Sequence, residues 1–269
     1  MDPNQEVFDR AAGSYNELAL MPAERAVLGR LRDDLSQLEM LDIGVGSGRT
    51  GYTFAPLVKR YVGIDYSPRM IDRARALLGE NGRVELRVAD ARSLASVEGS
   101  FDFVLFSYNG IDAVEHQDRL RIFAEVRDKL KPGGLFLFSS HSLGALPLSG
   151  RRRRGRNRST KLPWQVAEFA LDLRYGWHAR QSNRMLDLDG ARQRGWAIVR
   201  DPAHGFSLDV YYVDPASQLA QLREIGLDPL AVIDEHGEEV DPAASRRDAW
   251  LNYLCRLPDE AGVSPGPPG

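Results

Sequence analysis

The sequence has one cysteine, no long apolar run and almost no net charge, and each of these shortages excludes a class of protein. Cys255 alone cannot form an internal disulfide or a cysteine-based zinc cluster. No apolar run reaches the roughly 18 residues that a membrane-spanning helix needs. The opening stretch MDPNQEVFDR is polar and acidic, without the apolar centre of a secretory signal, so the cytoplasm is the expected compartment.

The charge balance also excludes a strongly basic protein. The chain has 35 basic and 38 acidic residues and a net charge of −3, which gives no global reason to expect nucleic acid as a partner. Its 269 residues, 43% of them hydrophobic, suit one large domain with a sizeable core, or one domain with an insertion. The sequence indicates no metal site, no membrane partner and no particular oligomeric state.

From residue 40 onward, short apolar runs of strand length alternate with helical stretches. The first five runs span residues 40–43, 61–64, 84–88, 101–106 and 135–138. This alternation predicts an α/β fold with a parallel sheet covered by helices on both faces. Ser67 and Pro68 predict a helix start, Gly79 its end, and the stretch 131–134 the end of a helix that carries Leu120, Phe123 and Leu130.

The two ends of the chain and its middle are organised differently. Residues 5–38 predict two amphipathic helices, the second starting at Pro22, and residues 144–205 predict an insertion with a helix near 164–173. Strands are then expected at 196–200 and 206–213, and a helix capped by Asp214. The last two runs, 230–233 and 250–255, could pair as an antiparallel edge hairpin, and residues 258–269 predict a disordered tail.

The main chemical signal is a strand that runs into alternating glycines and then a helix. Gly44, Gly46 and Gly48 suit a tight turn whose backbone a ligand approaches closely. Asp65 ends the next strand, 21 residues after Gly44, where a carboxylate can accept hydrogen bonds from both ribose hydroxyls. Asp90 follows the third strand. These strand ends meet at the carboxyl edge of one sheet, where such folds bind ligands.

Two cofactors compete for this turn. Residues 46–51, GSGRTG, also fit a dinucleotide fingerprint, with Asp65 19 residues beyond Gly46, so a nicotinamide-dependent oxidoreductase is one interpretation. Asp42 lies in the strand just before the glycines, and a negative charge there favours a cationic ligand over a diphosphate. S-adenosylmethionine, a sulfonium that carries an amino group, meets that requirement.

Over roughly residues 36–143 the sequence resembles the class I S-adenosylmethionine-dependent methyltransferases. The matching segments are LDIGVGSGRT at 41–50, YVGIDYSPRMI at 61–71, VADAR at 88–92, FDFVLFSYNGID at 101–112 and LKPGGLFLFSSH at 130–141. The resemblance implies a Rossmann-like, doubly wound, seven-stranded sheet, mostly parallel, with an antiparallel terminal hairpin and a lid insertion. The expected division is 1–38 for helices over the cofactor site, 39–143 for the cofactor-binding core, 144–213 for the lid, 214–256 for the rest of the core and 257–269 for the tail.

The resemblance also implies roles for individual residues. Gly44, Gly46 and Gly48 would lie beneath the methionine part of the cofactor, Asp42 toward its amino end and Asp65 on the ribose hydroxyls. Tyr66 and Met70 would flank the adenine, while Asp90 and the backbone at Ala91 would bind its edge. Ser107 to Asn109 would face the methyl group and the substrate. Tyr15, on a helix that covers the cofactor in similar enzymes, is a further candidate.

Methyl transfer to a neutral amine or hydroxyl also needs a group that takes up the proton. His141, directly after the fifth strand, is the first candidate base, followed by Asn109 and Tyr108. His204, Tyr211 and Tyr212 are candidate substrate residues, although Tyr211 and Tyr212 point to opposite faces of a strand, so at most one can line the pocket. His141 could instead serve as a structural hydrogen-bonding residue, and Met70 as an ordinary core residue.

A basic run from Arg151 to Lys161 carries seven positive charges with no acidic residue between them. Such a run suits a solvated loop, a lid over an anionic substrate, or a contact to nucleic acid. We therefore expect a methyltransferase that uses S-adenosylmethionine to methylate an oxygen or nitrogen of a small molecule. The alternatives are an RNA methyltransferase or RNA-binding protein that uses the basic run, and the nicotinamide-dependent oxidoreductase.

Overall fold

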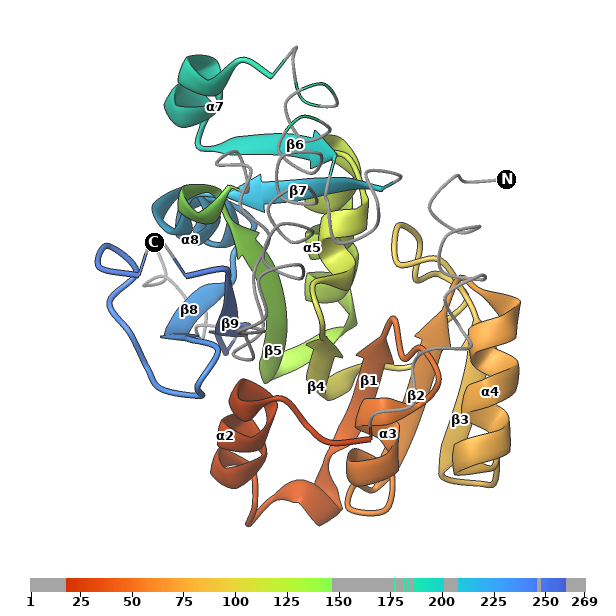
Figure 1. The fold of residues 1–269 in the computed structure, drawn as a ribbon. Coiled ribbons are helices and arrows are strands. Elements are labelled where there is room, and N and C mark those ends of the chain that lie inside the picture. Colours follow the sequence, from red (N-terminus) through yellow and green to blue (C-terminus); the bar gives the residue numbers. More distant parts are fainter. Residues whose placement is uncertain are drawn as a thin grey trace, which may run out of the picture.

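The protein folds around one large, mostly parallel sheet in the computed structural model, which describes residues 18–146, 177, 181, 183, 186–200, 208–245 and 248–259. Figure 1 shows the sheet at the centre with helices on both sides. Among the described residues, no helix has the length and apolar character needed to cross a membrane. The basic run from Arg151 to Lys161 lies outside the described residues, as do the helix expected near 164–173 and the tail from residue 260.

Helices and strands alternate through the first half of the chain, as the sequence predicts. The order is α2 (Pro22–Arg30), β1 (Glu39–Ile43), α3 (Arg49–Phe54), β2 (Arg60–Asp65), α4 (Pro68–Leu78), β3 (Val84–Val88), β4 (Phe101–Phe106), α5 (His116–Lys129) and β5 (Leu130–Ser142). Short 3-10 turns lie at Leu35–Gln37, Gly110–Ala113 and Leu143–Ala145. The second half contains α7 (Leu188–Arg194), β6 (Trp196–Arg200), β7 (Asp209–Val213), α8 (Pro215–Glu224), β8 (Asp228–Ile233) and β9 (Trp250–Arg256).

Nine strands form the sheet that the structure describes. Parallel pairing gives the order β3-β2-β1-β4-β5, and β5 then pairs antiparallel with β9, which pairs antiparallel with β8. These seven strands confirm the predicted mostly parallel sheet and its antiparallel terminal hairpin. The other two strands extend it, because β7 pairs in parallel with the last residues of β5 and β6 pairs antiparallel with β7.

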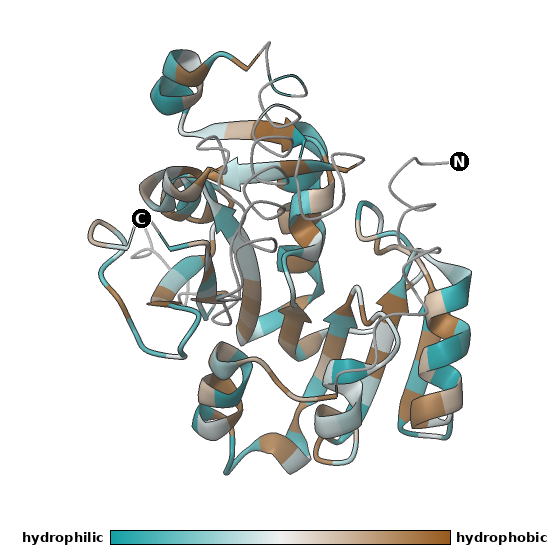
Figure 2. Cartoon of the chain, in the orientation of Figure 1, coloured by the Kyte–Doolittle hydropathy of each residue, from teal (hydrophilic) through white to brown (hydrophobic). Residues whose placement is uncertain are grey.

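Side chains from alternate strand positions pack into the two larger of three hydrophobic clusters in the described residues. Leu41 of β1 belongs to the core on one face, which α5 and α8 cover through residues such as Phe123 and Leu222. Met40 belongs to the core on the other face, where α2, α3 and α4 cover the sheet. Figure 2 shows apolar strands and helices with polar outer sides. The alternation of strand side chains therefore produces the doubly wound fold.

Local sequence signals define several helix ends as predicted. The Ser67 side chain accepts a hydrogen bond from the backbone N–H of Met70 and caps α4, which ends at Gly79 with a φ of 68°. The Asp214 side chain caps α8 in the same way, through the N–H of Ala216. These predictions hold because each depends on residues that are neighbours in the chain.

Two boundaries differ from the sequence prediction. α5 ends at Lys129, before the stretch 131–134, and Leu130 begins β5, where it pairs with Phe101 at an irregular start of the β4–β5 ladder. The predicted second helix of the N-terminal region ends at Arg30, although Leu31 and Leu35 still pack into the core. In both places tertiary pairing and packing override the local helical pattern.

Candidate active site

The glycine turn between β1 and α3 has a backbone that other residues adopt only with strain. Gly44, Gly46 and Gly48 have φ angles of 66°, 55° and 99°. A Cβ on Gly44 would come within 3.0 Å of the Phe106 ring. The backbone N–H of Gly46 donates to Oδ2 of Asp65 at 3.0 Å, which ties the turn to the end of β2. The turn therefore exposes backbone, rather than side chains, to the space above it.

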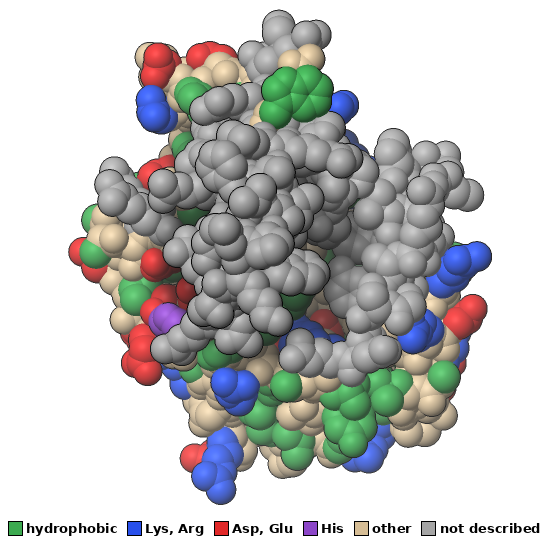
Figure 3. Space-filling view, viewed as in Figure 1, with side chains coloured by type: hydrophobic (Ala, Val, Ile, Leu, Met, Phe, Trp, Pro, Cys, Tyr) green, Lys and Arg blue, Asp and Glu red, His purple; other side chains and the backbone are tan. Residues whose placement is uncertain are grey.

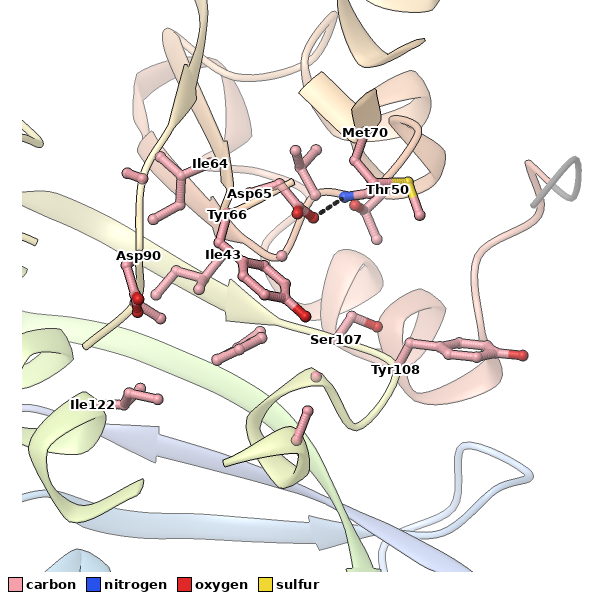
Figure 4. Close-up of a pocket in the computed structure, with 18 of the residues that line it drawn as sticks. Ile43, Thr50, Ile64, Asp65, Tyr66, Met70, Asp90, Ser107, Tyr108 and Ile122 are labelled. Atoms are coloured by element: carbon pink, nitrogen blue, oxygen red, sulfur yellow. Dashed lines mark hydrogen bonds between the residues drawn. The ribbon is translucent and has the colours of Figure 1, made fainter. Parts of the chain in front are cut away.

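A cavity of about 330 Å³ opens above this turn, at the carboxyl ends of β1, β2, β3 and β4. In Figure 4, Asp90 lies toward one end of the cavity and Tyr108 toward the opposite end. The lining includes many of the residues predicted to bind a cofactor or substrate: Gly44, Gly46, Asp65, Tyr66, Met70, Asp90, Ala91, Ser107 and Tyr108. The cavity is large enough for a nucleoside-sized ligand, and its polar groups are few.

Two aspartates of the cavity are held by donors of different kinds. Asp65 is 7% exposed, and its second oxygen, Oδ1, accepts the backbone N–H of Ser67 at 2.9 Å. The carboxylate of Asp90 accepts two guanidinium N–H groups of Arg92, which also contacts Asp118. Burial raises the pKa of Asp90, but the side-chain and backbone hydrogen bonds from Arg92 outweigh it, so the pKa is lowered overall.

Asp42 lies beneath the turn rather than in the cavity wall. It is 1% exposed, and its Oδ2 accepts hydrogen bonds from the Thr50 hydroxyl at 2.5 Å and the Tyr61 hydroxyl at 2.6 Å. Burial raises the pKa of Asp42 to about 6, against the opposing effect of these two hydrogen bonds. Since Thr50 lines the cavity and Asp42 does not, Asp42 contacts the site through Thr50. Gly48 is likewise outside the lining, where a Cβ would meet Leu77 at 3.2 Å.

An ion pair that the sequence did not reveal closes one side of the cavity. The guanidinium of Arg49 donates to both carboxylate oxygens of Glu24, at 2.6 and 2.7 Å, although Glu24 is only 1% exposed. Arg49 also donates to the Ser107 hydroxyl at 3.0 Å. This contact joins α2, α3 and the end of β4, three elements that are distant in the sequence. Glu24 occupies the third position of α2, which is an ordinary helix-start position and gives no sign of this role.

The chain leaves β4 through two residues in the left-handed region, Tyr108 with φ of 55° and Asn109 with φ of 57°. Non-glycine residues rarely adopt this conformation, and they persist where surrounding contacts hold them. The backbone N–H of Asn109 donates to the Ser139 hydroxyl at 2.7 Å. Tyr108 is 53% exposed, with Trp250 at 6.0 Å and the Arg49 guanidinium at 5.7 Å from its ring. This segment is therefore the most strained backbone next to the cavity.

His141 lies behind that segment, with its side chain 22% exposed and outside the cavity lining. Its ring Nδ1 lies 2.7 Å from Oδ2 of Asp112, and its backbone N–H donates to the same oxygen at 2.7 Å. Its Nε2 lies 3.4 Å from Nδ2 of Asn109. The structure thus brings two of the predicted catalytic residues together and adds a carboxylate that the sequence analysis did not select.

Tyr211 and Tyr212 face opposite sides of β7, as predicted. The Tyr212 ring lies 4.9 Å from the His141 ring, whereas the Tyr211 hydroxyl lies 2.7 Å from Nδ1 of His116. Tyr211 also stacks on Trp196 and fastens β7 to α5. Tyr212 therefore lies on the side of His141, and neither tyrosine lines the cavity. Tyr15 and His204 lie outside the described residues.

Neither the charges on the face that Figure 3 displays nor the metal-ligating groups of the described residues indicate another kind of site. Figure 3 shows Lys and Arg side chains spread among acidic ones on the face that it displays, rather than gathered into one patch. Among residues that the structure describes, no three His, Cys, Asp or Glu side chains are grouped to hold a metal ion. Cys255 is buried and free.

Comparison with known proteins identifies the domain. The family model described as "Methyltransferase domain" matches residues 40–134. An uncharacterized methyltransferase YcgJ of Bacillus subtilis (strain 168) is 30% identical over 51% of this chain and 55% of its own length. A ubiquinone biosynthesis O-methyltransferase of Cereibacter sphaeroides (strain ATCC 17025 / ATH 2.4.3) is 37% identical over 38% of this chain and 41% of its own. The chain spans about half the length of the curated relatives it matches.

The fold agrees over a longer stretch than the sequence does. The solved structure of the CcbJ methyltransferase from Streptomyces caelestis superposes with a TM-score of 0.62, covering 94% of this chain and 98% of that one, at 16% identity. The family model covers the glycine turn, Asp65 and Asp90, and the topology extends the match through the terminal hairpin. Residues 40–134 therefore match a methyltransferase domain, and the chain has the fold of a solved methyltransferase structure.

Proposed function

We propose that this protein transfers the methyl group of S-adenosylmethionine to an oxygen or nitrogen of a small molecule. The observation that carries the proposal is the cavity above the glycine turn, with Asp65 and Asp90 at the ends of neighbouring strands. A cofactor approaches that backbone closely because Gly44 and Gly46 place no Cβ in its way. When bound, the cofactor supplies an electrophilic methyl carbon on a positively charged sulfur.

We assign the parts of the cofactor in the order of the strands. The turn at Gly44 and Gly46 takes the methionine part. Asp65 takes the ribose hydroxyls, since its carboxylate lies at the end of β2 in the cavity lining and accepts hydrogen bonds. Tyr66 and Met70 flank the adenine, and Asp90 with the backbone of Ala91 binds its edge. Asp42 supports this arrangement from below, through Thr50.

The methyl acceptor binds where β4 and β5 end. Ser107 and Tyr108 line that end of the cavity, and Asn109, His141 and Tyr212 lie behind them. Holding the nucleophile in line at about 3 Å from the methyl carbon lowers the barrier by roughly 7 to 11 kcal/mol through proximity alone. His141 takes up the proton that the acceptor loses. The name of the ubiquinone biosynthesis relative supports an oxygen acceptor as one of the two options.

Calorimetry separates this function from its main rival. We expect the protein to bind S-adenosylhomocysteine and not NADH. Asp65→Ala weakens the binding of S-adenosylhomocysteine by about 1 to 3 kcal/mol, because ribose hydroxyls lose a charged acceptor. Asp72→Ala, at a carboxylate that is 75% exposed on α4, is the matched control and leaves the dissociation constant unchanged. Tight NADH binding without a response to S-adenosylhomocysteine would replace the proposal with an oxidoreductase.

A further inference from the structure

Beyond the cavity, an ion pair is completely buried between α5 and the turn that follows β4. Arg119 is 0% exposed and Asp112 is 1% exposed, and Nη1 of Arg119 lies 2.5 Å from Oδ1 of Asp112. The other terminal nitrogen of Arg119 donates to the Ser140 hydroxyl at 2.9 Å and to Oε1 of Gln218 at 2.6 Å. The guanidinium carbon also lies 4.7 Å from the centre of the Tyr211 ring. The pair therefore joins α5, α8, β5 and β7.

Asp112 receives donors on both oxygens. Arg119 and the Ser140 hydroxyl, at 2.7 Å, contact Oδ1, while the backbone N–H and Nδ1 of His141 contact Oδ2. An ionised carboxylate accepts hydrogen bonds and donates none, so Nδ1 of His141 carries the proton. In a neutral imidazole, the lone pair is then on Nε2. Asp112 thus selects the tautomer of His141.

Stability does not explain this arrangement. Burying two charges costs several kcal/mol per ion, and well-packed apolar residues of similar volume are often as stabilising or more so. The cluster also leaves polar atoms without partners, since Nε of Arg119 and Nε2 of Gln218 are buried and make no hydrogen bond. A buried ion pair that costs folding stability and lies beside a strained turn commonly serves a function.

Asn109, which lies next to His141, also has a buried polar atom without a hydrogen-bond partner. Asn109 is 8% exposed, and its Oδ1 is buried without a hydrogen-bond partner. Its Nδ2 lies 3.4 Å from Nε2 of His141, which is long for a hydrogen bond and leaves that lone pair open to a stronger donor. Nε2 of His141, whose side chain is 22% exposed, therefore remains at the end of β4 and β5 as an acceptor for a ligand that carries hydrogen on oxygen or nitrogen.

We propose that Asp112 and Arg119 are positioning residues that hold His141 as the proton acceptor for a hydroxyl or amine substrate, which rests on the proposed methyltransferase function. The lone pair of the acceptor atom forms a bond to the methyl carbon, and the electrons of the breaking carbon–sulfur bond return to sulfur. The O–H or N–H bond of the substrate breaks, and its proton moves to Nε2 of His141. Asp112 stabilises the resulting imidazolium, and Arg119 holds the Asp112 carboxylate in place.

The tautomer of His141 tests the positioning without any methyl acceptor. Protein labelled with ¹⁵N-histidine is measured by NMR at pH 8.5, where a neutral imidazole reports which nitrogen carries hydrogen. We expect His141 to be protonated on Nδ1 in the wild type, and the proton to shift substantially to Nε2 in Asp112→Asn. His236→Asn, at an exposed turn, identifies a resonance and leaves that of His141 unchanged. An Nε2–H tautomer in the wild type would overturn the proposal.

A second measurement tests the proton transfer itself. A panel of phenols, alcohols and primary amines is supplied with methyl-labelled S-adenosylmethionine, and the best acceptor is used for kinetics. We expect Asp112→Asn to lower kcat by about 100-fold with little change in KM. Ser140→Ala, which removes one donor to Asp112 and no charge, lowers kcat less, and its unfolding curve shows whether the fold is retained. If kcat is equal in both variants, the role of Asp112 and Arg119 is structural only.

Because Asp112→Asn leaves Arg119 buried and unpaired, the variant can fail to fold. The double variant Asp112→Asn with Arg119→Gln removes both charges together and keeps a neutral polar pair. It should bind S-adenosylhomocysteine with a dissociation constant within two-fold of the wild type and still show the loss of kcat. If no protein, wild type included, binds S-adenosylhomocysteine, the methyltransferase function fails, while the tautomer still decides the role of Asp112.

Discussion

The two halves of the site are built in opposite ways, which two buried carboxylates illustrate. Asp42, under the cofactor cavity, accepts hydrogen bonds from the neutral hydroxyls of Thr50 and Tyr61. Asp112, behind the acceptor end, accepts from the guanidinium of Arg119 and from His141. The first half includes the exposed backbone of the turn between β1 and α3, and the second consists of side chains brought together from separate elements. The proposed cofactor site thus contains a local turn, and the proposed acceptor site depends on long-range packing.

Removing the cation of the second half has the largest expected effect. Arg119→Met leaves Asp112 as an uncompensated buried charge, and breaking a buried pair in this way costs about 3 to 5 kcal/mol of the free energy of unfolding. Urea denaturation measures the loss. Arg121→Met, two residues later on α5 at a side chain that is 63% exposed, is the control and changes the value by less than about 0.5 kcal/mol. Similar stabilities for the two variants would show that the buried pair contributes no more than a surface charge.

Asp42, whose hydrogen-bond donors are the neutral hydroxyls of Thr50 and Tyr61, should make the free energy of unfolding depend on pH. Burial raises the pKa of Asp42 from 3.8 to about 6, so in the folded protein it keeps a proton that the unfolded chain has lost. Its contribution to stability is greatest below about pH 4 and disappears as pH rises through about 6. A shift of this size corresponds to about 3 kcal/mol.

Asp42→Asn removes that dependence while keeping an oxygen that accepts a hydrogen bond. Between pH 4 and 7, the wild type should lose up to about 3 kcal/mol more stability than the variant, as measured by urea denaturation at several pH values. Asp72→Asn, at the exposed carboxylate of α4, serves as the control. Parallel curves for the wild type and Asp42→Asn would mean that Asp42 titrates as it does in water.

The helix caps of the two halves should contribute equally to stability, because each cap depends on residues that are neighbours in the chain. Ser67→Ala removes the cap of α4 beside the cofactor, and Asp214→Ala removes the cap of α8 on the acceptor side. Each loses one side-chain acceptor for a helix N–H, which costs about 1 kcal/mol. Thermal or urea unfolding measures both. A several-fold difference between them would show that caps are coupled to the tertiary contacts of each half.

The contrast between local and long-range contacts explains which parts of the site the sequence predicted. The glycine turn, Asp65, Asp90 and the helix caps are readable because their partners are close in the chain or follow the regular spacing of strands and helices. Arg49 with Glu24, and Asp112 with Arg119, have no such signal, since their partners come together only when the sheet forms. Asp112 stands within the quoted segment FDFVLFSYNGID, yet nothing nearby distinguishes it from an ordinary loop aspartate. The start of β5 at Leu130 was missed because strand pairing, and not helix propensity, decided it.

The length of β5 has a consequence for how enzymes of this design diversify. Near its end, β5 is paired with a neighbouring strand on each edge. His141 is paired with Trp250 of β9 on one side and with Tyr212 of β7 on the other. The main chain that carries the imidazole is thereby anchored by two strands that come after the insertion. The segment between Ser142 and β6 can therefore change in length and composition during evolution while His141 keeps its register with both strands.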